Sequence, residues 1–526
     1  MTFRKSRRVH FQRQHTVCRI IFLMAALMFG LRFPSPASAD ELFPQAYGIL
    51  AKEKYIFPVD LGDWPVKIDS RRQLFVDDFL LKSKTHIERE FHQFKKHPKN
   101  PLYTAPKQPG LIYLVLRDED GKFRMWYEAR MFYIDKDGNR RRRPTVYIES
   151  DDGLNWRAPK LGVVVADGNT DNNYVFEKGL EGMFYEPWEK DPSRRFKGLA
   201  HMEPGNDENQ PEPMEAYWLY VSPDGIRWRR DREYPVIKSL NGYRLPQSGI
   251  GDTSSFRWDP VLKKYICNAK FVLPGKYRCY GICESDDLIH WTPPRMLFHY
   301  DELDPPGMQI YAHTTSNYES IWLGFVKTME VVKTEWGTRK HCEMQLSFSR
   351  DGRHFTRPTH RRPCIPVPSY ARRAGSDYPC MATGVPLKVD NELWFYYGDT
   401  RHHEERITPE TLSRIGLLTL RIDGFASLNA GDEPGEVVTR PLTFSGKSLF
   451  VNADVQPGGW VKAAVLTADG SPLAGYEAEH SSAVTTDTIH GGVTWANQSA
   501  LPSTPQGHTR FRFALKNARL YSFWVE

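Results

Sequence analysis

The sequence has little that would hold the chain in a membrane. One apolar run, residues 20–29, follows six arginines and lysines and precedes the small residues Ala37, Ser38 and Ala39. A basic segment, a short apolar segment and a small-residue end are typical of a signal peptide, which we place at residues 1–39. We therefore predict an exported protein, periplasmic or extracellular. A single membrane anchor is the alternative, although this run is shorter than a spanning helix.

Beyond the predicted signal peptide the sequence also lacks an excess of charge. The whole chain has a formal charge of +7, and all seven excess cations precede Asp40, where there is no Asp or Glu. A chain that begins near Asp40 would have a formal charge of zero. This balance gives no reason to expect a nucleic-acid partner. We predict no nucleic-acid partner and no stable membrane span after cleavage.

Cysteine is scarce, with seven residues in 526, of which Cys18 lies in the predicted signal. The other six could form disulfides in an exported protein, for instance Cys267 with Cys279 or Cys283 in one hairpin, and buried free thiols are the alternative. Cys279 and Cys283 have no second ligand pair at zinc spacing. We predict no metal site and no cofactor. Two alternatives remain: a structural calcium ion at the centre of the fold, and a metal ion bound by residues 402–405 (His-His-Glu-Glu).

What the sequence does have is a repeated turn. The segment Ser-Asp-Asp-Gly-Leu-Asn-Trp at residues 150–156 has relatives at 222–228, 285–291 and 349–355, which start 72, 63 and 64 residues apart. A unit of that length can hold a four-stranded sheet. Ser and Asp oxygens can accept bonds from turn amides, Gly tolerates positive φ, and the aromatic residue can pack between sheets. We predict that these turns are structural and not catalytic.

Aromatic and β-branched runs separated by turn residues surround each copy, without helical periodicity. Five such units within residues 40–430 predict an all-β fold, a five-bladed β-propeller, in which a strand at residues 73–81 could close the ring. Residues 431–526 are richer in Gly, Ala, Ser and Thr and contain short alternating segments. They predict a C-terminal β-sandwich.

These features together resemble the five-bladed glycosidases of glycoside hydrolase families 32, 43, 68 and 130. More closely, the chain resembles exported bacterial proteins identified as glycosyl hydrolases of the family 32 or 43 type. Matching segments are Leu-Phe-Val-Asp-Asp at 74–78, Phe-Arg-Met-Trp-Tyr at 123–127, Gly-Asp-Thr at 251–253, Trp-Asp-Pro at 258–260, Glu-Leu-Trp-Phe-Tyr-Tyr at 392–397 and Pro-Leu-Thr-Phe-Ser-Gly-Lys at 441–447. The resemblance implies an exported glycoside hydrolase acting on a polysaccharide or oligosaccharide. The invertase-type Trp-Met-Asn-Asp-Pro-Asn-Gly, Arg-Asp-Pro and Glu-Cys motifs are absent, so we transfer no catalytic residue from those families.

Glycoside hydrolysis needs one protonated and one ionised carboxyl group, about 5–5.5 Å apart for retention and about 6.5–9.5 Å apart for inversion. In propellers of this kind the innermost strands line a central funnel, so acids near the first strand of each blade are the candidates. A turn or ring-closing role is the alternative for each of them. The predicted catalytic residues are Asp252, Asp377, Glu319, Glu186 and Asp78.

Other polar residues near the ends of strands could bind sugar hydroxyls. The predicted substrate-binding residues are Glu128, Arg130, His313, Asp399, Arg401 and His402. Four arginines at residues 140–143 form a predicted hairpin tip, either a solvated loop or a contact for an anionic polysaccharide. A non-catalytic glycan-binding propeller is the alternative function, and a phosphorylase or lyase on the same fold is a third. The sequence leaves the sugar and the linkage open.

Overall fold

The computed structural model describes residues 65–526 except 105–108, 130, 203–215, 239–253, 274–276, 335–336, 366–377, 382–385, 401–413, 497, 499 and 503–507. Its secondary structure is almost entirely strand, with short 3-10 helices at Pro192–Arg194 and Ala478–His480. Within the described ranges, no helix is long and apolar enough to cross a membrane. The predicted signal peptide lies outside the described residues.

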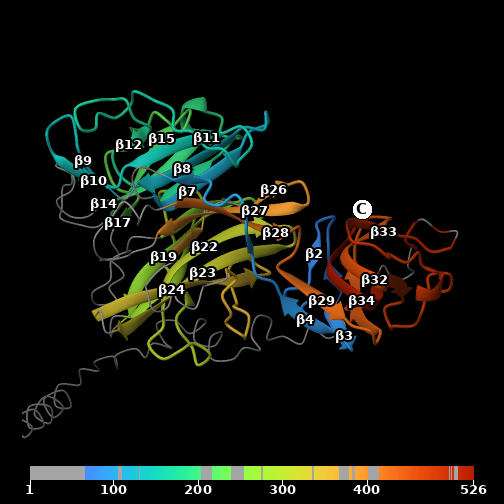
Figure 1. Cartoon of the computed structure of the whole chain (residues 1–526). Helices are drawn as coiled ribbons and strands as arrows, with labels where there is room; N and C mark the ends of the chain where they lie inside the picture. The colour runs from blue at the N-terminus through green and yellow to red at the C-terminus, as the bar shows by residue number, and fades with distance from the viewer. Residues whose placement is uncertain are drawn as a thin grey trace, which may run out of the picture. The chain divides into compact units, whose positions relative to one another are not determined.

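Five antiparallel sheets follow one another along the chain and form the blades of a propeller (Figure 1). Blade one contains β7 (Pro109–Arg117), β8 (Phe123–Ala129), β11 (Thr145–Ser150) and β12 (Tyr174–Phe176). Blade two contains β13 (Gly182–Tyr185), β14 (Phe196–Met202), β15 (Ala216–Ser222), β16 (Arg229–Arg230) and β17 (Ile237–Lys238). Blade three contains β18 (Ser255–Asp259), β19 (Lys264–Leu273), β20 (Tyr277–Ser285) and β21 (Arg295–Phe298).

Blade four contains β22 (Gln309–Tyr318), β23 (Ile321–Thr334) and β24 (Gly337–Ser349). Blade five contains β25 (Tyr378–Met381), β26 (Leu387–Val389), β27 (Glu392–Thr400), β28 (Arg414–Arg421), β5 (Lys95–Lys96) and β6 (Tyr103–Thr104). The prediction of an all-β chain with a five-bladed propeller is confirmed.

The first strand of each blade is the innermost one. β7 contacts both β13 and β25, and β18 contacts both β13 and β22, so these strands surround the centre of the ring. Because every blade repeats the same up-and-down order, the inner strands all begin at one face of the propeller. We call this the entrance face, and the face with the repeated turns the opposite face.

Residues 95–104 close the ring. The prediction that a strand at residues 73–81 could close it was wrong. β5 and β6 pair with β28 and complete blade five. β2 (Gln73–Leu74) instead pairs with β34 (Arg510–Val525) of the C-terminal sheet. An apolar pattern indicates that a strand is buried, but it does not select the strand with which it pairs.

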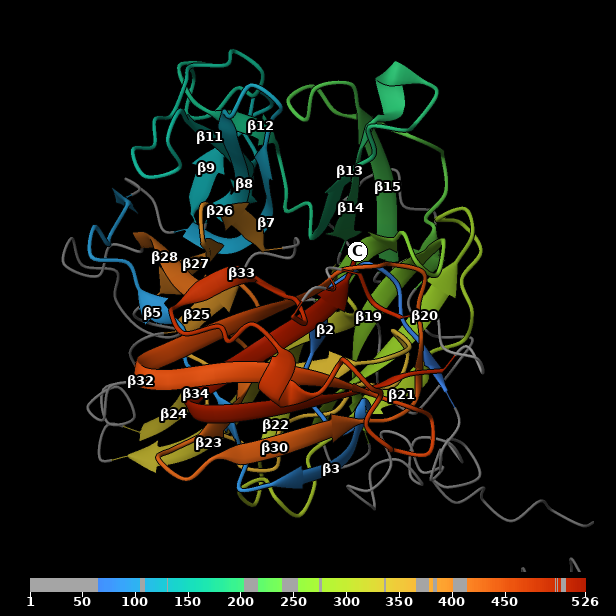
Figure 2. The ribbon, with the colours of Figure 1, turned by 90° about the vertical axis from the view of Figure 1, so that its right-hand side faces the viewer.

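The C-terminal residues form one sheet of eight strands together with three strands from residues 73–91, and we call it the C-terminal sheet (Figure 2). Its longest strands, β32 (Leu449–Leu466) and β34, pair along most of their length, with register shifts in β32. The remaining strands are β2, β3 (Leu81–Thr85), β4 (Glu88–Phe91), β29 (Ala426–Ala430), β30 (Gly435–Thr439) and β33 (Thr488–Val493), and a separate parallel pair joins β1 (Val66–Lys67) to β31 (Leu442–Thr443). Hydrogen bonds link all eight strands of the large sheet, so a sandwich of two separate sheets stays a prediction.

The repeated turn joins neighbouring blades. In its first copy, Ser150 Oγ accepts from the Gly153 amide at 2.9 Å, and Asp152 Oδ1 accepts from the Leu154 amide at 2.8 Å. The indole of Trp126 in blade one donates to the carbonyl of Gly225 in blade two at 2.8 Å. The Tyr396 hydroxyl of blade five likewise donates to the carbonyl of Gly153 at 2.8 Å. The first two copies therefore each offer a backbone carbonyl to a large aromatic residue of the adjacent blade, which is the structural role expected from the sequence.

Replacing Gly225 by Ala is expected to lower the free energy of unfolding by roughly 3 kcal/mol. Gly225 has φ of +74°, and a Cβ there would lie 2.7 Å from Trp126 Cζ2, so left-handed strain of about 1–2 kcal/mol adds to overpacking of about 1–3 kcal/mol. Gly121→Ala is the matched control, because Gly121 has φ of +87° but no atom within 4 Å of a new Cβ. Urea unfolding of both variants measures the difference. Equal losses would show that the contact with Trp126 adds nothing.

Candidate active site

Two hydrogen-bonded pairs of buried polar side chains lie at the entrance face, one in blade one and one in blade two. Glu181 directly precedes β13, Glu128 lies near the end of β8, and Tyr217 lies at the start of β15. The Tyr217 hydroxyl donates to Glu181 Oε2 at 2.9 Å, and the Tyr113 hydroxyl donates to Glu128 Oε2 at 3.4 Å. All four residues are at least nine-tenths buried.

The short segment that carries Glu181 is held between two blades by close packing. A Cβ at Gly179 would lie 2.5 Å from the Tyr113 hydroxyl of blade one and 3.8 Å from Glu128 Oε2. A Cβ at Gly182 would lie 2.3 Å from Phe256 of blade three. Because the two glycines leave no room for side chains, the backbone fits against both neighbours and fixes the position of Glu181.

Tyr217 holds the carboxyl group of Glu181 in place. Burial and the neighbouring Glu181 raise the pKa of Tyr217 well above its ordinary value, so the phenol keeps its proton and donates it in the hydrogen bond. Arg143 Nη1 lies 4.0 Å from Glu128 Oε2 and brings a positive charge to the second carboxyl group. The two glutamates are carboxyl groups of the kind that glycoside hydrolysis requires.

Two of the predicted catalytic residues, Asp252 and Asp377, lie outside the described residues. In the chain, Asp252 comes two residues before Ser254, and Asp377 directly precedes β25. Both therefore fall just before the inner strand of a blade, as Glu181 does. Their catalytic roles stay predictions.

Glu186 and Glu319 lie at the far ends of inner strands, away from the entrance face. Glu186 follows β13, is 2% exposed and forms an ion pair with Lys197. Glu319 lies in the tight turn between β22 and β23, where its carboxylate binds Lys388 Nζ at 2.5 Å and accepts from the Arg72 amide at 3.1 Å. These ion pairs give both residues a structural place at the opposite face.

Glu181 is an acid beside β13 that the sequence prediction does not include. Phe184 and Tyr185 identify the strand correctly, and an acid lies at each of its ends, Glu181 before β13 and Glu186 after it. Because inner strands begin at the entrance face, only the preceding acid lies there. The signal was present in the sequence as Glu-Gly at residues 181–182.

Asp78 lies beside the C-terminal sheet and not in the funnel. Its exposed carboxylate pairs with Arg89 and, at 3.6 Å, with Lys84. Asp78 lies there because the segment that carries it joins the C-terminal sheet through β2 and does not close the ring. The prediction of a catalytic role for Asp78 conflicts with this position.

Of the predicted sugar-binding residues, Glu128 lies in the site, whereas Arg130, Arg401, His402 and the side chain of Asp399 lie outside what the structure describes. His313 is completely buried, with Nε2 3.1 Å from Ser347 Oγ and its ring in edge contact with Phe298 and Phe355. The prediction that His313 binds substrate conflicts with this burial in an aromatic core.

His313 is expected to make stability depend on pH. Burial and the charges of Arg257 and Arg357 lower its pKa to about 3, whereas the pKa of an unfolded histidine is about 6.5. Between these values the unfolded chain binds more protons, so stability falls as the pH drops through this window. We expect His313→Gln to lose less stability than the parent between pH 7 and pH 4.5, by about 2 kcal/mol. Urea titrations at both pH values test this, and the exposed His290→Gln is the control; equal losses in H313Q and the parent would contradict it.

Five cysteines, Cys267, Cys279, Cys283, Cys342 and Cys364, are buried thiols outside any disulfide. Cys267 and Cys283 lie opposite each other in β19 and β20. Burial raises the pKa of Cys283 to about 12. Of the two alternatives, the structure favours buried thiols for these five. Among the residues that the structure describes, no three His, Cys, Asp or Glu side chains gather in a way that could hold a metal ion.

The four arginines of residues 140–143 lie in and after β10 (Arg140–Arg142), which pairs with β9 (Phe132–Ile134). The Arg140 guanidinium lies over the Phe132 ring at 3.8 Å, and Arg141 forms an ion pair with Asp135 at 2.6 Å. These two cations are therefore held within the hairpin. Phe132 is 57% exposed and presents an aromatic face.

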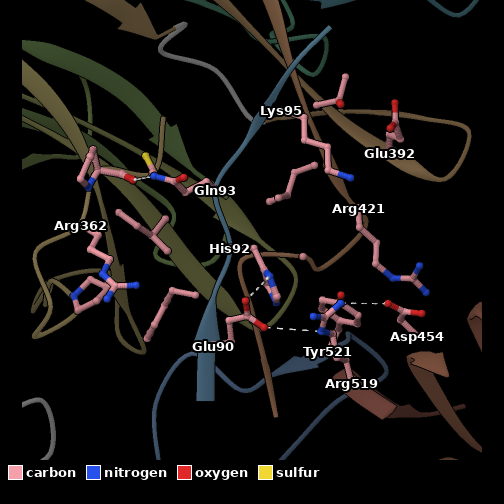
Figure 3. A pocket seen from close by; sticks show the side chains of 18 of the residues that line it. Glu90, His92, Gln93, Lys95, Arg362, Glu392, Arg421, Asp454, Arg519 and Tyr521 are labelled. Carbon is pink, nitrogen blue, oxygen red and sulfur yellow. Dashed lines mark hydrogen bonds and ion pairs between the residues drawn. The ribbon is translucent and has the colours of Figure 1, made fainter. Parts of the chain in front are cut away.

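A groove of about 690 Å³ lies between the propeller and the C-terminal sheet (Figure 3). Its lining includes Glu90, Asp454 and Arg519 from the sheet and Lys95 from blade five. Arg519 lies 3.6 Å from Glu90 and 3.5 Å from Asp454, so both carboxylates share one cation. The charges of the groove largely neutralise one another, and we assign it no catalytic role.

Comparison with known proteins gives similarities at the level of the fold. No protein-family model and no curated protein matches the sequence. A solved glycoside hydrolase is 13% identical, with 65% of this chain and 92% of that chain covered and a TM-score of 0.38. The Bombyx mori GH32 beta-fructofuranosidase is 9% identical (83% and 94% covered, TM-score 0.40), and a family 43 arabinoxylan arabinofuranohydrolase from Bacillus subtilis is 10% identical (82% and 99%, TM-score 0.37). At these values the similarity assigns no residue and no substrate.

Proposed function

We propose that the protein is an exported glycoside hydrolase that cleaves a polysaccharide or oligosaccharide at the entrance of the propeller funnel. The observation that carries the proposal is the Glu181 carboxylate, which is buried at the start of an inner strand and is held by the Tyr217 hydroxyl. A buried and oriented carboxylate at a funnel entrance is suited to proton transfer or to attack on an anomeric carbon. Export follows from the signal-like segment at residues 1–39.

In this proposal Glu181 acts in its ionised form, as general base or nucleophile. The general acid is Glu128, or one of the two acids that precede inner strands in the sequence, Asp252 and Asp377. The acid gives its proton to the glycosidic oxygen as the C–O bond breaks, and water supplies the hydroxyl group that joins the anomeric carbon. The proton released by that water returns to a carboxylate, so the two groups end in their starting forms.

A glycan-binding propeller without catalysis is the second candidate. It is favoured by the exposed Phe132 ring on the β9–β10 hairpin, with the Arg140 guanidinium stacked over it. An exposed aromatic face with a cation beside it can bind a sugar without chemistry.

Incubation of the protein with a panel of plant and algal glycans separates the two candidates. Mass spectrometry of the soluble products, together with a binding measurement on each glycan, gives both readouts. New reducing ends from at least one glycan support the hydrolase. Binding to a glycan without any release of product would overturn it in favour of the binding protein.

A further inference from the structure

Two tryptophans from neighbouring blades form one aromatic surface at the opposite face of the propeller. Trp188 lies in the turn after β13 of blade two, and Trp258 lies in β18 of blade three. Their ring centroids are 6.2 Å apart, and the two ring planes meet at 46°. Trp188 is 57% exposed, whereas Trp258 is half-buried. We call these two residues the tryptophan platform.

The fold holds both rings of the tryptophan platform in place. Trp258 makes an edge contact with the ring of Tyr265, at a centroid distance of 4.8 Å. The turn that carries Trp188 is fixed by the next residue, Glu189, whose carboxylate binds Lys197 Nζ at 2.9 Å. Because the rings are positioned before a ligand arrives, a ligand that binds them loses less free energy to the ordering of side chains.

The tryptophan platform is remote from the candidate active site. Trp188 follows the far end of β13, Trp258 is the next-to-last residue of β18, and Glu181 precedes β13 at the entrance face. The segment that joins the C-terminal sheet packs on blade four at the opposite face, where Arg350 lies 2.8 Å from Asp77. Trp188 therefore faces solvent on the opposite face, where a bound ligand could take no part in chemistry at Glu181.

The size and the polarity of the tryptophan platform favour a sugar as its ligand. One tryptophan side chain offers about 150–250 Å², whereas a stable protein contact covers about 800 Å² of each partner. Glu189 and Lys190 follow Trp188 in the same turn and place polar groups beside the aromatic surface. A pyranose ring with equatorial hydroxyl groups has an apolar C–H face and a polar edge. Its face can stack on an indole while its hydroxyl groups bind the polar side chains at the margin.

We propose that the tryptophan platform is a second, non-catalytic binding site for a chain of pyranose sugars, and that the substrate is a polysaccharide. This inference rests on the proposed hydrolase function and narrows its substrate class. A polymer held at the opposite face stays close to the protein, so the local concentration of its other segments at the entrance rises. A short oligosaccharide that fills only one site gains nothing from the platform.

The binding test uses native gels that contain soluble arabinoxylan, mixed-linkage β-glucan or β-1,4-galactan. The Glu181→Gln variant is run as the parent of this series, because it is expected to leave the polysaccharide in the gel intact. We expect at least one gel to retard it, and the added Trp188→Ala change to weaken binding about tenfold. Trp188→Phe keeps an aromatic face and should lose less. Tyr234→Ala is the matched control and should bind normally, because Tyr234 is 55% exposed in the same blade but lies beside Arg232 instead of a second aromatic ring.

Kinetics on long and short substrates then connect the tryptophan platform to hydrolysis. With Glu181 intact, we expect Trp188→Ala to raise KM about tenfold on the polysaccharide that binds, with kcat unchanged. Its kinetics on a short oligosaccharide cut from the same polymer should equal those of the parent. Thermal unfolding confirms that the variant is folded, as expected for the loss of an exposed side chain.

The possible outcomes separate this inference from the hydrolase. Failure of all three gels to retard the protein, or equal retardation with and without Trp188, would overturn the platform. A change of oligomeric state in Trp188→Ala, with glycan binding unaltered, would overturn it in favour of a contact between proteins. Hydrolysis that does not depend on Trp188 for any polymer would also overturn the platform and leave the hydrolase standing. Binding that depends on Trp188, without product from any glycan, would overturn the hydrolase and leave the platform.

Discussion

Replacing Asp423 by Ala is expected to lower the free energy of unfolding by about 3–5 kcal/mol, because the change leaves the Arg72 cation of a buried ion pair without its partner. Asp423 is completely buried, and its Oδ2 lies 2.8 Å from Arg72 Nη1. The same oxygen accepts from Ser522 at 2.6 Å and from Asn452 at 2.9 Å, and Oδ1 accepts from the Tyr318 hydroxyl at 2.8 Å. One carboxylate thus joins blade four, the end of blade five and the C-terminal sheet.

Asp286→Ala is the matched control for this prediction. Asp286 belongs to a copy of the repeated turn, is 76% exposed in its side chain and pairs only with Lys264 among its described contacts. Exposed ion pairs contribute about 0–1 kcal/mol, so its loss should be small. Urea unfolding at neutral pH measures both variants. An unfolding midpoint for Asp423→Ala equal to that of the parent would show that this network does not hold the sheet to the propeller.

Replacing Glu181 by Gln is expected to reduce the rate of glycan hydrolysis by about 10³-fold, since loss of an acid/base group costs about 10²–10⁴-fold. Gln has nearly the same shape, and its carbonyl oxygen can still accept the hydrogen bond from Tyr217. The substitution therefore removes the charge and leaves the packing between Gly179 and Gly182 intact. We expect kcat to fall while binding of substrate is retained.

Glu119→Gln controls for the loss of a carboxylate, because Glu119 is an exposed residue in the β7–β8 turn at the opposite face. Its activity should equal that of the parent. Asp252→Asn in the same assay tests the assignment that comes from sequence alone. If Glu181→Gln retained the activity of the parent, Glu181 would have no part in catalysis.

The propeller could be predicted because each blade is marked by a short turn whose residues are close together in the sequence. Each of the four turns carries its own Ser and Asp, and three of them carry Gly. Leu288, which replaces Gly in the third copy, has the same left-handed conformation, with a φ of +66°. The C-terminal sheet was harder, since the strand at residues 73–74 pairs with residues more than four hundred positions away. Nothing in a short apolar segment specifies so distant a partner.

The candidate site could be predicted only in part, because its contacts also join residues that are far apart in the sequence. Acids beside inner strands can be found in the sequence, but which end of β13 faces the entrance follows only from the direction of that strand in the ring. The contacts of Glu181 with Tyr217, and of Trp188 with Trp258, join different strands or different blades. The burial of His313 among aromatic rings also depends on residues from other strands, which its neighbours in the sequence do not reveal.

The most direct test of the central claim follows the oxygen of water into the product. The parent and Glu181→Gln are incubated in H₂¹⁸O with the glycan that the panel identifies, and the new chain ends are analysed by mass spectrometry. Hydrolysis at this site predicts one ¹⁸O atom at each new reducing end with the parent, and almost no product with Glu181→Gln. Unlabelled or unsaturated ends, or equal labelled product from both proteins, would contradict the account.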